Sequence, residues 1–127
     1  MEVNKTNTLP YYKSDYKKGE FKLIGRSVDE MVNDFYNVII EDIKIYSYNP
    51  KDSKLIIDMD YYNTRTSIFL KDIFNILVSI KNKGYNVEID WHYYKDDIDM
   101  AAAGNDYSEL TGLKFNLIKK DKYFNII

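Results

Sequence analysis

The stretch "KLIIDMDYYNTRTSIF", Lys54 to Phe69, changes its periodicity in the middle. The part from Lys54 to Tyr61 is too short for a typical helix and rich in residues that favour strands, so it predicts a strand buried on at least one face. From Ile68 onward, apolar residues recur at helical spacing until Gly84, which supplies a stop signal. A strand that passes directly into a helix is a building unit of α/β folds.

The residues before this stretch predict a hairpin and a first helix. Two short extended runs surround a Lys-Lys-Gly turn signal between about Leu9 and Gly25, which indicates an antiparallel hairpin, and Pro10 fits an edge strand. Ser27 followed by Glu30 has the pattern of a capping box. The apolar residues that follow recur at helical spacing and predict an amphipathic helix that ends near "SYNP".

The residues after Gly84 predict two further strands around a third helix. The segment "YNVEIDWHY" alternates apolar and polar residues, which is typical of a strand with one face on the core. The acidic segment "KDDIDM" suits the start of a helix, and Gly112 suits its end. A last strand follows at "LKFNLI".

The predicted order of elements is therefore ββαβαβαβ. This order implies right-handed crossovers, three main helices and a mixed sheet of about five strands whose later strands are parallel. We expect a single α/β domain over residues 1–127, with residues 1–8 and 119–127 as terminal extensions and an apolar tail, "DKYFNII", that is able to dock. Ligands and partners of such sheets gather where strands end and helices begin, and "DYYNTRTSIF" is one such place.

Composition excludes several classes of protein. The chain has no cysteine, which removes disulfides, thiolate nucleophiles and Cys-ligated zinc. A formal net charge of -2 gives no broad attraction to nucleic acid. No apolar run approaches the roughly 20 residues needed to cross a bilayer, and no secretory signal opens the chain. We therefore expect a cytoplasmic protein with no nucleic-acid or membrane partner.

Hydroxyl side chains cluster where the central strand meets its helix. Thr64, Thr66 and Ser67 lie there beside Asn63 and Arg65. One interpretation is structural, because Ser, Thr and Asn at such a position ordinarily cap the helix. The other is functional: one hydroxyl is a regulatory phosphorylation site, since exposed helix N–H groups, the helix dipole and a neighbouring arginine would accept a phosphate. The pattern alone does not choose among the three hydroxyls.

Two further groups are weighed as sites. His92 is the only histidine, so a Ser-His-Asp system would have to use it, yet it lies on the polar face of its strand and is more simply an exposed strand residue. Asp96, Asp97 and Asp99 could bind a divalent cation, but they match no EF-hand spacing and suit a solvated helix start.

A carboxylate pair is the last candidate for chemistry. Asp58 and Asp60 alternate along the central strand on one face with Tyr62, and Asp90 is near them if the strands are neighbours. No phosphate loop or G-x-S-x-G elbow accompanies them. We therefore expect no enzymatic activity, no cofactor and no metal site.

The residues quoted above resemble a known family. The stretches "LIIDMDYYNT", "KDIFNIL", "VEIDWHYY" and "DDIDMAAAGNDYSELTGLKF" look like the SiaC family of bacterial regulatory phosphoproteins, whose fold is similar to STAS domains of the anti-sigma-factor-antagonist type. The resemblance covers about Thr8 to Ile118. Its most specific parts are "YYNT" before the helix and "WHYY" followed by acidic residues.

The resemblance implies a role for one hydroxyl. In the family, the threonine that follows asparagine is phosphorylated, which corresponds to Thr64 here. The flanking residues expected to face partners are Tyr62, Asn63, Arg65, Thr66 and Ser67.

The resemblance also implies partner switching. A dedicated protein kinase phosphorylates the threonine, a PP2C-type phosphatase removes the phosphate, and the unphosphorylated protein binds and activates a diguanylate cyclase, with cyclic-di-GMP signalling and biofilm control as the output. The chain has Arg65 and Thr66 where a member of the family has two serines after the threonine, and it has Ala102 and Asn105 where acidic residues are common in the family. The alternative is a STAS-like module that senses a ligand or binds a protein without phosphorylation.

Overall fold

The computed structural model describes residues 1–121 as one mixed sheet covered by helices. The strands are β1 (Glu2–Val3), β2 (Tyr11–Asp15), β3 (Glu20–Ser27), β4 (Ser53–Tyr62), β5 (Val87–Tyr94) and β6 (Lys114–Lys120). The helices are α1 (Val32–Ser47), α2 (Thr64–Asn82) and α3 (Ile98–Thr111). The predicted tail in residues 122–127 lies outside the described residues.

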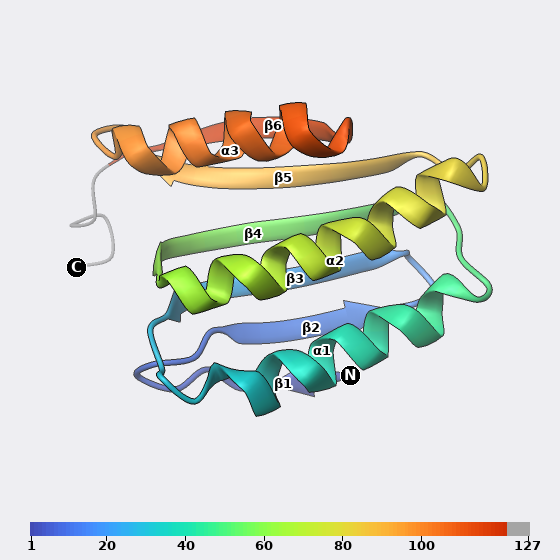
Figure 1. The fold of residues 1–127 in the computed structure, drawn as a ribbon, viewed down its shortest axis with the longest axis horizontal. Coiled ribbons are helices and arrows are strands. Elements are labelled where there is room, and N and C mark those ends of the chain that lie inside the picture. Colours follow the sequence, from blue (N-terminus) through green and yellow to red (C-terminus); the bar gives the residue numbers. More distant parts are fainter. Residues whose placement is uncertain (122–127) are drawn as a thin grey trace.

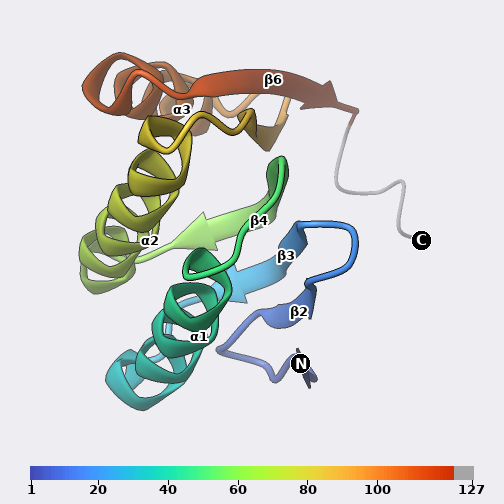
Figure 2. The same cartoon turned by 90° about the vertical axis from the view of Figure 1, so that its right-hand side faces the viewer.

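The strands lie side by side in chain order, β1 to β6. The strands β1, β2 and β3 pair antiparallel, whereas β3, β4, β5 and β6 pair parallel. Each parallel step crosses over through a helix in the same direction, so all three helices cover one face of the sheet and the other face is open (Figures 1 and 2). The predicted α/β class, helix number and parallel strands are confirmed.

The core lies between the sheet and the helix layer. Strand residues that alternate toward the helices are buried there, and Trp91 of β5 is fully buried. Its indole Nε1 donates to the carbonyl oxygen of Met100 at 2.9 Å. A Cβ added to Gly104 of α3 would lie 2.7 Å from Trp91 Cδ1, so the absence of a side chain lets α3 approach the indole closely.

The sheet has six strands rather than about five. Glu2 and Val3, expected in a terminal extension, pair with Lys13 and Tyr12 and form β1. A strand of two residues has no periodicity for sequence analysis to detect. As a result, β1 pairs with part of β2, so β2 is not an edge strand along that part. Pro10, which was predicted to lie in an edge strand, comes just before β2.

The predicted capping box is wrong. Ser27 is the last residue of β3 and fully buried, and α1 begins only at Val32. Met31 occupies the N-cap position of α1, and no side chain caps that end. Because pairing with β4 continues as far as Ser27 and Tyr62, Ser27 is still extended where a helix was expected to begin, and Glu30 lies in the turn before α1.

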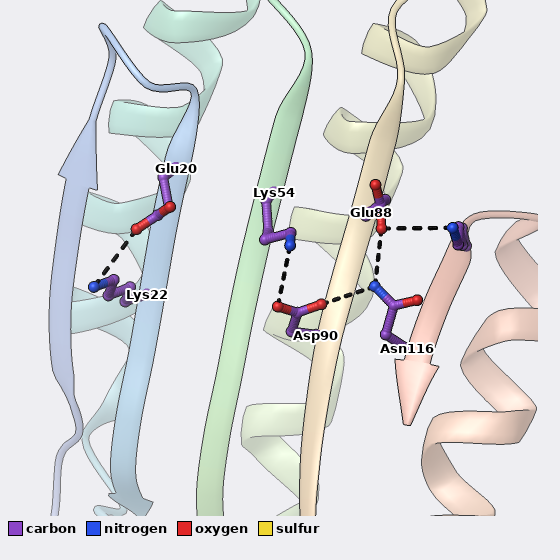
Figure 3. Close-up of polar contacts among 7 residues, drawn as sticks. Glu20, Lys22, Lys54, Glu88, Asp90 and Asn116 are labelled. Carbon is purple, nitrogen blue, oxygen red and sulfur yellow. Dashed lines mark hydrogen bonds and ion pairs between the residues drawn. The ribbon is translucent and has the colours of Figure 1, made fainter. Parts of the chain in front are cut away.

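The open face of the sheet carries linked charges (Figure 3). The side-chain amide of Asn116 in β6 donates to Glu88 Oε1 and to Asp90 Oδ1, each at 2.9 Å. Lys54 of β4 lies 3.4 Å from Asp90, and Lys114 of β6 lies 3.8 Å from Glu88. This network therefore joins three strands on the side that no helix covers.

Among the described residues, no helix combines the length and apolar character that a membrane crossing requires.

Candidate functional site

The candidate site lies where the parallel strands end and the helices begin. The strands β3, β4 and β5 all point toward the edge at which α1, α2 and α3 start (Figure 1). Thr64 is the first residue of α2, and its side chain is exposed. The predicted junction of strand and helix is therefore at the edge where α/β sheets gather their ligands and partners.

A β-bulge shapes the chain just before Thr64. Gly25 of β3 pairs with Met59, but Arg26 pairs with Tyr61, so Asp60 is an extra residue in β4. Beyond the bulge, the side chains of β4 that face the helices are no longer those that strict alternation along the strand would place there. Tyr61 is 55% exposed, whereas Tyr62 packs against the core.

The bulge corrects the predicted carboxylate face. Tyr62 lies on the helix side, where its ring centroid is 6.2 Å from that of buried Trp91, and it does not share the face of Asp58 and Asp60. Asp60 pairs with the Arg26 guanidinium at 3.1 Å, and Asp58 pairs with Lys120. Each carboxylate thus has its own cationic partner.

The N-cap of α2 is Asn63. The structural interpretation allowed Asn, Ser or Thr as the cap, and Thr64 does not have this role. Asn63 has extended backbone angles, and its Oδ1 accepts from the Thr66 backbone N–H at 2.9 Å. Its side-chain amide also donates to the carbonyl oxygen of Asp29 at 3.3 Å. Because Asn63 caps the helix, the Thr64 hydroxyl is not needed for that purpose.

The three hydroxyls of the cluster differ in accessibility. Thr66 is fully buried, and its Oγ1 lies 2.7 Å from both Asn63 Oδ1 and Ser27 Oγ. Ser67 is half-buried as a residue, and its hydroxyl donates to the Thr64 carbonyl oxygen at 2.5 Å. Thr64 is therefore the most accessible of the three to another protein.

A buried hydroxyl network supports the start of α2, and sequence analysis missed it. Ser27 Oγ lies 2.8 Å from the hydroxyl of Tyr36 in α1, which is itself fully buried. Burial raises the pKa of Tyr36 to about 12. The network ties β3, α1 and α2 together next to the start of α2. No sequence pattern signals it, because its residues come from three separate elements.

The loop before α1 is part of the same site. Met31 N and the Thr8 hydroxyl both donate to the Asp29 carboxylate, and these hydrogen bonds hold its pKa below the usual value. Asn63 binds the backbone of the same residue. The start of α2 is thus connected to the N-terminal segment of the chain.

The electrostatics at the start of α2 suit an anion. The first turns of α1 and α3 contain Asp34 and Asp99, but the first turn of α2 has no acidic residue. Arg65 is exposed there and donates to Asn33 Oδ1 at 3.4 Å. The positive end of the α2 dipole therefore has no carboxylate of its own helix beside it.

A small hollow adjoins Tyr62. It has a volume of about 270 Å³ and lies between the end of β4 and the start of α3. Its lining residues are Tyr61, Tyr62, Asp97, Asp99 and Met100. Burial raises the pKa of Tyr62 above its ordinary value, so this phenol remains protonated at neutral pH.

The structure also places His92 and the acidic residues that sequence analysis had weighed and judged to be structural. His92 Nδ1 is buried and has no hydrogen-bond partner among residues 1–121, so no carboxylate in that range orients the imidazole through this nitrogen. Asp97 caps α3 by accepting from Met100 N at 3.0 Å, as a helix start requires. In the part of the chain that the structure describes, no three His, Asp or Glu side chains are grouped to hold a metal ion.

Comparison with known proteins gives a family and a fold. The family model described as "SiaC family regulatory phosphoprotein" matches residues 3–120. A search of curated proteins gives no match.

Two solved structures from Pseudomonas aeruginosa are similar to this chain. SiaC in complex with the diguanylate cyclase SiaD, of which it is described as the activator, has a TM-score of 0.89 with 19% identity, covering 94% of this chain and 99% of that one. The apo-SiaC structure has a TM-score of 0.84 with 19% identity, covering 93% of this chain and 97% of that one. At this level of identity the two structures establish a shared fold.

Proposed function

Because the chain belongs to the SiaC family of regulatory phosphoproteins, we propose that it is a partner-switching protein controlled by phosphorylation of Thr64. The main support is the position of Thr64: it is exposed at the first turn of α2, while the neighbouring Thr66 is fully buried. A protein kinase transfers the γ-phosphoryl group of ATP to Thr64 Oγ1, which loses its proton, and ADP leaves. A PP2C-type phosphatase restores the hydroxyl by hydrolysis with water.

The start of α2 can carry the phosphate without unfolding. A phosphothreonine adds a charge of about -1.5 to -2, which the positive end of a helix dipole and a nearby guanidinium stabilise. Arg65 supplies that guanidinium, and the first turn of α2 holds no competing carboxylate. Asn63 continues to cap the helix, so the modification changes the surface and leaves the fold in place.

The proposed client is a diguanylate cyclase. SiaC of Pseudomonas aeruginosa is described as the activator of such an enzyme, with which it forms a complex. By analogy, the unphosphorylated chain binds and activates a cyclase, and the output is the level of cyclic-di-GMP. In this scheme the chemistry belongs to the kinase, the phosphatase and the cyclase, the chain itself is non-enzymatic, and the switch operates in the cytoplasm.

The phosphorylated chain is the form that does not bind the cyclase. A dianion that enters an interface without a partner loses its hydration, which costs several kcal/mol. Each 1.4 kcal/mol corresponds to about tenfold in affinity, so this cost lowers occupancy by orders of magnitude.

The direct test is mass spectrometry of the chain after incubation with ATP and its cognate protein kinase. We expect one phosphate on Thr64 and none on the Thr64→Ala variant. Phosphate found only on Thr66 or Ser67 would refute the assignment. Loss of the phosphate on adding a PP2C-type phosphatase completes the cycle.

A further inference from the structure

The Ser67 hydroxyl can change its hydrogen-bond partner without loss to the helix. It donates to the carbonyl oxygen of Thr64, three residues back along α2, at 2.5 Å. In an α-helix the same carbonyl oxygen also accepts from the backbone N–H four residues later, which belongs to Ile68. Because a carbonyl oxygen has two lone pairs, the bond from Ser67 is additional to the helical one. The carbonyl oxygen of Thr64 therefore remains paired when the hydroxyl turns away.

The other short polar side chains at the start of α2 are already committed. Thr66 is fully buried, and its Oγ1 lies 2.7 Å from both Asn63 Oδ1 and Ser27 Oγ. Asn63 caps the helix with Oδ1, and its side-chain amide donates to the carbonyl oxygen of Asp29. Between Asn63 and Ser67, the side chains that remain able to respond to a new charge on Thr64 are those of Arg65 and Ser67.

These two side chains lie on opposite sides of Thr64 around the helix. At 100° per residue, Arg65 is about 100° from Thr64 in one direction and Ser67 is about 60° from it in the other. The Arg65 guanidinium reaches toward α1, where Nη1 donates to Asn33 Oδ1 at 3.4 Å. Residues three apart on a helix have Cβ atoms about 5–6 Å from each other, and helical side chains lean toward the N-terminus. A phosphate on Thr64 would therefore lie between the guanidinium and the hydroxyl.

The strength of the possible hydrogen bonds favours a new partner for Ser67. A hydrogen bond to an ionised acceptor is roughly twice as strong as one between neutral groups. The change requires only a rotation of the Ser67 side chain between staggered rotamers, and the backbone of α2 stays in place. A phosphate oxygen within reach would thus take the hydroxyl from the carbonyl oxygen of Thr64.

We propose that Ser67 binds the phosphate of phosphorylated Thr64: its hydroxyl turns from the carbonyl oxygen to a phosphate oxygen, on the side opposite Arg65. The inference rests on the proposed function and names the groups that hold the modification in place. Hydrogen bonds donated to the phosphate favour its dianionic form. More of the modified chain then carries the full second charge at neutral pH, which strengthens the block on binding.

The test is phosphorus NMR of the full chain with the phosphate installed on Thr64 during protein synthesis, so that it does not depend on a kinase. Titration of the phosphorus signal gives the second pKa of the phosphate. We expect this pKa to lie below that of phosphothreonine in a peptide of residues 60–69. Ser67→Ala should raise the pKa by an amount that corresponds to about a twofold gain in proton affinity or more, and Arg65→Gln should also raise it.

The matched control is Ser79→Ala. Ser79 also lies on α2, and its hydroxyl donates to the carbonyl oxygen of Ile76, three residues back, at 2.5 Å. It is about four helical turns from Thr64. This variant removes the same kind of bond and should leave the pKa of the phosphate unchanged. Ser67→Thr keeps a hydroxyl at the position and should keep the pKa low, and circular dichroism checks that each variant is folded.

Three results would overturn the inference. They are a pKa that Ser67→Ala does not alter, an equal change in Ser79→Ala, and a pKa in the folded chain equal to that in the peptide. Failure of the cognate kinase to modify Thr64 is a separate result: it would contradict the proposed switch, while the pKa of the installed phosphate would still decide whether Ser67 binds it.

Discussion

The residues Thr64 and Thr66 have similar side chains but opposite surroundings. The Thr64 side chain is exposed at the edge of the sheet, and that of Thr66 is fully buried against Ser27 and Asn63. A kinase can reach the first in the folded protein, whereas the second is accessible only after local opening. In the proposed switch the two threonines therefore have separate roles, that of Thr64 in phosphorylation and that of Thr66 in stability.

Substitution of Thr64 separates phosphorylation from binding. We expect Thr64→Ala to keep cyclase binding and Thr64→Asp to weaken it by roughly tenfold, because a carboxylate supplies part of the phosphate's charge. Isothermal titration with the cyclase measures both. Ser79→Asp, on the exposed far end of α2, is the control and should bind normally. Equal affinity of Thr64→Asp and the unmodified chain would argue against an electrostatic off state.

Substitution of Thr66 tests the buried network. Thr66→Val preserves the shape of the side chain but leaves Asn63 Oδ1 and Ser27 Oγ short of a partner, so the free energy of unfolding should fall by about 1–3 kcal/mol. Urea denaturation measures the change. Ser67→Ala, at a half-buried position, should lose about 0.5–1.5 kcal/mol at most. A Thr66→Val protein as stable as the parent would mean that the network contributes no net stability.

At the scale of elements, α2 and α3 reach their positions by different means. The helix α2 is fixed at its start by Asn63 and the network below it, and α3 is fixed by its close approach to Trp91. Gly112 ends α3 in the left-handed conformation, with φ of 71°, as its place after the last helical residue predicted. The ends of these helices thus depend on local chemistry, and their packing depends on the size of facing side chains.

The α3 contact is tested by Gly104→Ala. The new Cβ would lie 2.7 Å from Trp91 Cδ1 and from Leu117 Cδ2, and overpacking of this kind costs about 1–3 kcal/mol. Alanine gains about 1 kcal/mol in helix propensity over glycine, so the expected net loss is up to about 2 kcal/mol in unfolding free energy. Ala102→Gly on the exposed side of α3 measures the propensity effect alone. A more stable Gly104→Ala protein would disprove the close contact.

At the scale of the whole molecule, the helices leave one face of the sheet to the solvent. Charged and amide side chains from β4, β5 and β6 cover part of that face through linked contacts (Figure 3). The arrangement gives the fold a single buried layer, so its stability comes from one core.

The open face should make stability depend on pH. The Asn116 amide and then the Lys114 ammonium hold the pKa of Glu88 below its ordinary value of 4.5. A carboxyl whose pKa is lower in the folded state stabilises that state above its unfolded pKa, and this contribution is lost as the pH falls through the folded pKa. The free energy of unfolding should therefore decrease with acidification below pH ~4.5.

The control for this pH dependence is Asn116→Ala, which removes the main cause of the shifted pKa. Denaturant unfolding across pH 3 to 7 should give a smaller loss for the variant than for the parent chain. An identical profile for the two proteins would contradict the role of Asn116.

The sequence by itself determined the order of elements after β1 and the place of the candidate site. The spacing of apolar residues predicted the hairpin, three helices and later strands. Each element must bury one side, and the period of its apolar residues shows which side that is. The strand-to-helix junction at "DYYNTRTSIF" was visible for the same reason. The capping box at Ser27 failed because a local motif does not report that pairing with β4 keeps the chain extended there.

The tertiary structure alone decided which hydroxyl is exposed and which face of the sheet Tyr62 lies on. Thr66 is buried by Ser27 and Tyr36, which come from β3 and α1, and the bulge at Asp60 turns Tyr62 toward Trp91. The physical reason is that burial depends on neighbours distant in sequence, whereas periodicity records only the burial that each element needs.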